Sequence, residues 1–309
     1  IGYQAMAVHT SGAKNIAIGY QAMDDTDAGA NSKASNNNIF MGYRAGSGTF
    51  TDVQSNNNTC IGSYTTGANL DGALNNTALG YNTFAALTSG DNNTAIGSLS
   101  GDAITTGSQC TAVGHQALTA NQTGSYITAI GNNALTACTA SENTAVGWDA
   151  GGSIVGGTSN VMIGSNAGDT LTSGNSNTCL GDSSDVSATG STNQTAIGFA
   201  TIAQADNSVT LGNASVDAVY MNQNKTAKVL AGGIAFTGSE LTVSSGAVTA
   251  TGSYHRIDTE GDASTDSLVT INGGVDGQLL ILQSAGSARD TTLEDTGDAG
   301  GNLFLSADF

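Results

Sequence analysis

The chain has 309 residues, of which 25 are acidic and 7 basic, for a formal net charge of −18. This balance excludes nucleic acid as a partner and disfavours anionic membrane surfaces, because both are bound through clustered Lys and Arg. Only 10% of the residues are charged, glycine contributes 43 residues and proline is absent. No apolar run approaches the roughly 20 residues of a membrane helix, so we expect no membrane insertion.

The dominant feature of residues 1–216 is a repeated motif of Asn, a β-branched residue, a small residue, an aliphatic residue and Gly. It occurs as NTALG at 76–80, NTAIG at 93–97 and NTAVG at 143–147. The glycines that close its copies are Gly2, Gly19, Gly42, Gly62, Gly80, Gly97, Gly114, Gly131, Gly147, Gly164, Gly181, Gly198 and Gly212. Their spacing is mostly 17 residues, which predicts an all-β stack of short coils, a β-helix or β-roll. We expect about thirteen coils, each with two short strands and a polar loop.

Each position of the motif has an expected environment. The β-branched and aliphatic residues, such as Thr77 and Leu79, share one strand face because side chains alternate. We expect this pair to form the thin core of a coil, together with one apolar residue from a second segment such as 20–23. The small residue between them, such as Ala78, would then face a neighbouring chain, since a lone chain with so thin a core is marginal. The recurrent Asn predicts stacked amide ladders.

The repeats resemble the head repeats of trimeric autotransporter adhesins, most closely at NSVTLGNAS, 207–215. The longer coils resemble those of phage tail-fibre proteins. Residues 241–274 and 276–282 resemble a module found near the C-termini of tail-fibre proteins, whose core residues match Gly273, Gly274, Asp276, Gly277, Gln278, Leu280, Leu282, Arg289 and 301–303. The resemblance implies a homotrimeric fibre, with the module truncated at Phe309 and a tip that lies further on or differs.

Three regions are predicted: a β-repeat shaft at 1–216, a neck at 217–251 and a tail-fibre-type β module at 252–309. Segments 241–243 and 247–249 alternate around 244–246, which predicts a β-hairpin. Segments 269–271 and 279–282 predict a second strand pair.

We predict no catalytic residue, no cofactor and no metal site. The four cysteines form no CxxC pair, and Cys60 and Cys179 stand where other copies carry Ala, so we expect free thiols, with these two buried. Only three His are present and none lies at ligand spacing from a Cys, which disfavours zinc. No GxSxG, P-loop or GxGxxG motif occurs. His255, near Asp258 and Glu260, is interpreted as a surface or trimer-contact histidine.

Two further groups have a structural and a functional interpretation. Asp24, Asp25 and Asp27 resemble part of a calcium loop but lack its closing bidentate Glu, which favours a solvated loop. An aromatic residue follows the closing glycine in several coils: Tyr3, Tyr20, Tyr43, Tyr81 and Trp148. Packing along the rod is the favoured interpretation, and a stripe that contacts carbohydrate is the alternative.

The expected function is therefore that of a non-enzymatic virion fibre, the shaft of a phage tail fibre that carries attachment to the host surface. Its expected partners are copies of itself, other tail or baseplate proteins, and a glycan or protein receptor on the host. The alternative is a bacterial surface adhesin or extracellular filament built from the same repeats. A glycosidase spike is disfavoured, because the chain has only four Glu and its short coils leave little room for a sugar cleft.

Overall fold

The computed structural model describes residues 1–7, 9, 12–24, 34–50, 53–219, 239–245, 247–249, 254–258, 265–268, 270–272, 281–284 and 290–293. The chain divides into two compact units, 1–220 and 221–309. Within the described residues, the regular structure is entirely β.

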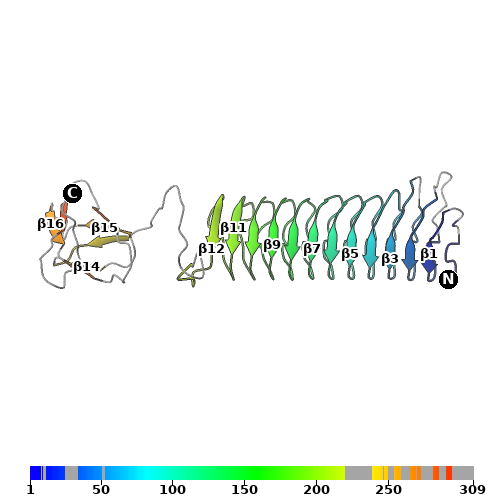
Figure 1. The fold of residues 1–309 in the computed structure, drawn as a ribbon, viewed down its shortest axis with the longest axis horizontal. Coiled ribbons are helices and arrows are strands. Elements are labelled where there is room, and N and C mark those ends of the chain that lie inside the picture. Colours follow the sequence, from blue (N-terminus) through cyan, green and yellow to red (C-terminus); the bar gives the residue numbers. More distant parts are fainter. Residues whose placement is uncertain are drawn as a thin grey trace. The chain divides into compact units, whose positions relative to one another are not determined.

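The first unit is a parallel β-solenoid (Figure 1). Its strands pair in chain order, and each motif lies in register on the next, as Thr77 on Thr94 and Thr94 on Thr111. The twelve strands are β1 (Ile16–Ile18), β2 (Ile39–Met41), β3 (Thr59–Ile61), β4 (Thr77–Leu79), β5 (Thr94–Ile96), β6 (Thr111–Val113), β7 (Thr128–Ile130), β8 (Thr144–Val146), β9 (Val161–Ile163), β10 (Thr178–Leu180), β11 (Gln194–Ile197) and β12 (Ser208–Leu211).

These strands enclose about 11 coils of roughly 17 residues, fewer than the thirteen expected. Thirteen is the number of closing glycines. Only Ile1 precedes Gly2 and no strand triplet is present there, which leaves twelve strands, and twelve stacked strands enclose eleven coils. Ile1 nevertheless accepts a hydrogen bond from the Gly19 amide at 2.8 Å, as the corresponding residues do in later coils.

Each coil contains one strand, so the expected second strand is wrong. The segment after the closing glycine has positive φ at alternate residues, for example 58° at Asn133 and 50° at Leu135. The Asn133 amide therefore donates backward to His115 O, whereas the Leu135 amide donates forward to Ala150 O, both at 3.0 Å. The result is a series of turns that still bonds to the coils on both sides.

The core is the reverse of the one expected from the motif. In β1–β11 the middle residue of the triplet is buried in the coil interior; Ala78 is an example, and Thr77 and Leu79 on either side of it are exposed. The larger core side chains come from the turns and loops, for example Phe84 and Leu87. The strand supplies small residues because the turn segment lies directly opposite it across a narrow interior.

Two coils show how tightly this interior is filled. Phe40 and Met162 occupy the middle of β2 and β9, where most coils carry Ala. In both coils the facing turn carries a glycine, and a Cβ at Gly46 or Gly168 would overlap the Phe40 ring or the Met162 thioether. A large side chain on the strand is thus accommodated by removing one from the turn.

The predicted amide ladder is confirmed in the buried asparagines. Asn76 Nδ2 donates to Asn58 Oδ1 at 3.0 Å and to Gly90 O at 2.8 Å, and its backbone amide donates to the same Asn58 oxygen at 3.0 Å. The ladder is interrupted at Cys110 and Ile127. There Asn121 substitutes from the loop, with its Nδ2 donating to Gly124 O at 2.9 Å.

The second unit is also built from parallel strands. Its sheets are β13–β15–β18, β14–β17 and β16–β19. The strands are β13 (Ser239–Thr242), β14 (Ala247–Thr249), β15 (Tyr254–Asp258), β16 (Thr265–Leu268), β17 (Thr270–Asn272), β18 (Ile281–Ser284) and β19 (Asp290–Leu293).

The structure does not show either of the two strand pairs predicted in this unit. β13 and β14 share a single antiparallel bridge, Ser244 to Ala247, and then each pairs in parallel with a later strand. β17 pairs with β14 and β18 pairs with β15, so β17 and β18 do not form the expected pair. Strands adjacent in sequence thus lie in different sheets, and each pairs with a strand two or three places away along the chain. Most of the predicted neck, 220–238, and the matched module residues other than Leu282 lie outside the described residues.

Candidate interaction surface

The outward face of β1–β12, which we call the strand face, consists of the first and last residue of each motif triplet. Thr or a β-branched aliphatic residue occupies the first position, and Ile, Leu, Val or Met the last. None of these outward residues is charged, although the chain carries a net charge of −18. The strand face is thus an uncharged surface that runs along the solenoid.

The aliphatic row of the strand face is substantially open to water. Its most exposed members in the last triplet position lie between 37% and 47% exposed: Ile18, Ile61, Leu79, Ile96, Ile130, Ile163, Leu180, Ile197 and Leu211. Scattered exposed aliphatic residues are ordinary, but a contiguous apolar row is typical of an interaction site. Because consecutive coils are in register, the row repeats once per coil.

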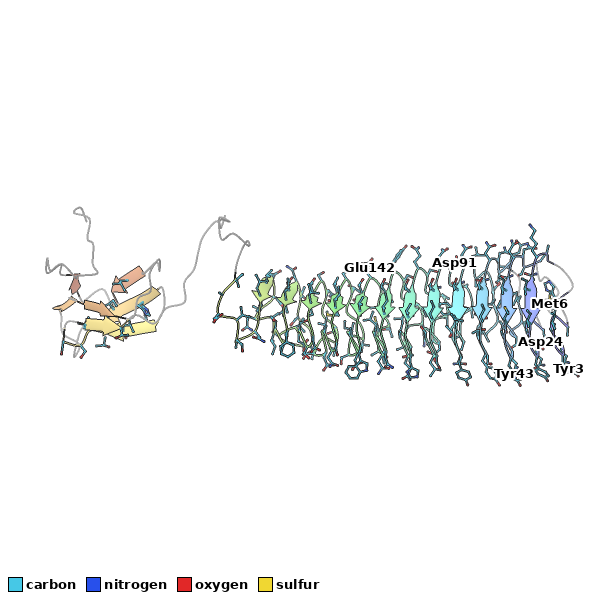
Figure 2. The ribbon with its side chains drawn as sticks, turned by 60° about the horizontal axis from the view of Figure 1, so that its bottom comes forward. Tyr3, Met6, Asp24, Tyr43, Asp91 and Glu142 are labelled. Carbon is cyan, nitrogen blue, oxygen red and sulfur yellow. The ribbon has the colours of Figure 1, made fainter. Side chains whose placement is uncertain are left out.

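The two long edges of the solenoid differ in chemistry. Figure 2 shows Tyr3 and Tyr43 projecting from one edge, with Asp91 and Glu142 on the opposite edge. Asp91 and Glu142 belong to the loops before the strands, where they bond to neighbouring coils. Asp91 Oδ1 accepts the Leu74 amide at 2.7 Å, and Glu142 Oε2 accepts the Ser159 hydroxyl at 3.0 Å.

The aromatic edge is a continuous row of five tyrosines, one in each of five consecutive coils. The ring centroids are 5.6 Å apart for Tyr3 and Tyr20 and 5.2 Å apart for Tyr20 and Tyr43, with near-parallel planes. Tyr43–Tyr64 and Tyr64–Tyr81 are edge-to-face at 5.3 and 6.0 Å. Sequence reasoning found four of these residues and missed Tyr64, which stands one place later after its glycine. Trp148 occupies the same coil position as most of the row, and it is exposed.

All four cysteines are free, as predicted, and all four are buried, whereas burial was predicted only for Cys60 and Cys179. Burial raises the pKa of the Cys60 and Cys179 thiols to about 12. The thiolate is the reactive form, so we expect no labelling by a thiol reagent at pH 8 while the solenoid is folded. Labelling followed by mass spectrometry should give four modified cysteines only after denaturation. Rapid native labelling of Cys60 would contradict the packing of the coil interior.

Asp102 carries a buried carboxylate oxygen, Oδ1, that has no hydrogen-bond partner. Desolvation raises the pKa of this carboxyl, although the amides of Asp102 and Ala103 partly oppose the shift. A raised pKa means that the folded state holds the proton more tightly, so the group's contribution to stability falls as the pH rises past the ordinary range of Asp.

We therefore expect Asp102→Asn to raise the melting temperature at pH 7 and to leave it unchanged at pH 3. Asp169→Asn, on an exposed turn at the same coil position, is the matched control and should change little at either pH. An equal effect of Asp102→Asn at both pH values would show that its charge is not the cause.

Among the described residues, the remaining candidates form no site. His255 is buried within the second unit and is not the surface residue considered above, and the side chains of Asp258 and Glu260 lie outside the description. Asp25 and Asp27 also lie outside it. Within the described part of the chain, no group of three or more His, Cys, Asp or Glu could hold a metal ion. No described helix is long and apolar enough to cross a membrane.

The sequence analysis placed the first and last residues of each triplet in the core, whereas the structure places them on the outside of the coil. The available signal was the small residue in the middle of most motif triplets, which is what a narrow interior requires. Comparisons with protein-family models, with curated proteins and with solved structures return no match. The fold is that of a parallel β-solenoid, and the features that point to a function are its strand face and its tyrosine row.

Proposed function

We propose that this chain is a structural fibre component, the shaft of a phage tail fibre, which carries attachment to a host surface and has no enzymatic activity. The observation that supports this most is the uncharged strand face along twelve in-register strands. A stack of this kind is stiff, because each coil is bonded to both neighbours through turns, strands and asparagines. Such a rod can hold an attachment site at a distance from the virus particle that carries it.

Copies of the chain are the partners that the strand face fits best. Identical copies aligned in parallel place aliphatic residues opposite aliphatic residues in every coil, and no charge has to be buried. The proposed assembly is a homotrimer, in which three copies of each weak binding site act together on the host surface. This arrangement uses the strand face, in place of the small-residue face considered from sequence.

Light scattering of the whole chain at two concentrations tests the assembly. We expect a mass of three chains, and we expect Ile96→Lys with Ile130→Lys to reduce it to one by placing charges in the apolar row. Val155→Lys is the control, because Val155 is an aliphatic residue on a loop that is more exposed than Ile96 and Ile130. A folded monomer for the unmodified chain would overturn the assembly.

The location is tested by labelling with antibodies raised against the chain. Under the proposal they bind tail structures of virus particles. Binding to the surface of uninfected bacteria would support the alternative, an adhesin or extracellular filament. Turnover of host polysaccharide by the purified chain would contradict a purely structural role.

A further inference from the structure

The tyrosine row, Tyr3, Tyr20, Tyr43, Tyr64 and Tyr81, is not required by the coil that carries it. Its most exposed members are Tyr3 at 70% and Tyr81 at 54%. The equivalent position in the next two coils is Ser98 and then His115. The strands of those coils keep the same parallel register, so the coil folds in the same way with or without an aromatic residue here.

The side chains that follow the tyrosines are planar and can form hydrogen bonds. Gln4, Gln21, Arg44 and Asn82 come directly after Tyr3, Tyr20, Tyr43 and Tyr81. The Gln21 side-chain amide donates to the Gln4 amide oxygen at 3.2 Å, so these two side chains lie beside each other in adjacent coils. The Arg44 charge is close enough to act on the Tyr64 phenol. The carboxylates Asp91 and Glu142 lie on the opposite edge (Figure 2).

We propose that the tyrosine row binds a neutral, linear polysaccharide of pyranose units that lies along the edge of the solenoid. The centroid spacing of 5.2–6.0 Å is close to the length of one sugar unit in an extended chain, so successive sugars can meet successive rings. Because Tyr3, Tyr20 and Tyr43 stack on one another, their faces are turned to neighbouring rings, and the row presents ring edges and phenol hydroxyls to a chain that lies along it. The phenol hydroxyls, amides and guanidinium supply donors and acceptors for sugar hydroxyls.

Other occupants fit the row less well. Nucleic acid also stacks on aromatic rings, but a net charge of −18 opposes its phosphates. A second copy of the chain is better matched by the dry aliphatic strand face than by a row tipped with hydroxyl groups. The proposal is independent of how many chains assemble and of whether the protein belongs to a virion, because it depends only on the exposed rings.

Native affinity electrophoresis of the whole chain tests the proposal, with soluble mixed-linkage β-glucan, xylan and dextran as the probes. We expect at least one of these polysaccharides to retard the protein. Tyr20→Ser with Tyr43→Ser and Tyr64→Ser should weaken that binding about tenfold or more, because three of the five rings and their phenol hydroxyls are removed from the row. Trp148→Ser is the matched control, because it removes a single exposed aromatic from the same coil position and should leave binding unchanged.

Circular dichroism of the triple variant checks its fold, and Tyr81→Ser at the end of the row serves as a milder variant that should weaken binding partially. Absence of retardation by all three polysaccharides would overturn the proposal, as would equal retardation of the wild-type chain and the triple variant. Light scattering of the triple variant distinguishes a loss of glycan binding from a loss of the proposed assembly. If the triple variant lowers the native mass, the tyrosine row is a contact between copies and the glycan site is rejected, whereas the fibre proposal stands.

Discussion

Gly131→Ala is expected to destabilise the solenoid by at least about 3 kcal/mol, because it combines backbone strain with a steric overlap. Gly131 closes its motif with a φ of 140°, a conformation that residues with a Cβ rarely adopt. The added Cβ would also overlap the carbonyl oxygen of Gly147 in the next coil. Neither backbone can move away, since the Gly147 amide donates to Ile130 O at 2.8 Å.

The control is Gly156→Ala, where the added Cβ meets no atom within 4 Å. Unfolding in urea, followed by circular dichroism, should show a lower midpoint for Gly131→Ala and little change for Gly156→Ala. Equal midpoints for the two variants would show that the close approach of successive closing glycines does not limit stability.

Asn160→Ala is expected to cost about 3 kcal/mol, because it leaves several buried polar groups without partners. The side-chain Nδ2 of Asn160 donates to Asn143 Oδ1 at 3.1 Å and to Gly174 O at 3.0 Å. Its own Oδ1 accepts both the backbone amide of Asn177 at 2.9 Å and the Asn177 side chain at 3.1 Å. Truncation to Ala removes these four bonds within a fully enclosed part of the coil.

Asn75→Gly is the matched control, because it removes an exposed side-chain amide and because glycine tolerates the φ of 60° found at this position. Hydrogen exchange should show faster exchange of the amides around Asn160 and Asn177 in the first variant, with the control close to wild type. Unchanged exchange in Asn160→Ala would mean that the ladder does not hold adjacent coils together.

The interruption of this ladder at Cys110 and Ile127 shows why local sequence alone is insufficient. Both residues break the motif at the Asn position, and sequence reasoning offers no replacement for the lost bonds. The structure provides one through Asn121, which lies in the loop and satisfies both the carbonyl and the amide of Gly124 at 2.9 Å. Loop residues can substitute for motif residues because the coil folds the loop back against the strand.

The sequence by itself determined the period, the all-β class, the stacking of motifs, the amide ladder, the free thiols and the burial of Cys60 and Cys179. These follow from a repeated pattern, because identical segments placed at equal intervals can satisfy their backbone groups only by stacking in register.

The tertiary structure alone decided which side of each strand is inside. Alternation of Thr77, Ala78 and Leu79 is compatible with either orientation, and apolar content alone favours burial of the larger pair. The inward orientation of Ala78 is imposed by the turn that lies across the narrow interior, and turn geometry depends on alternate positive φ values that the motif does not specify. For the same reason the exposed strand face became visible only in the folded coil.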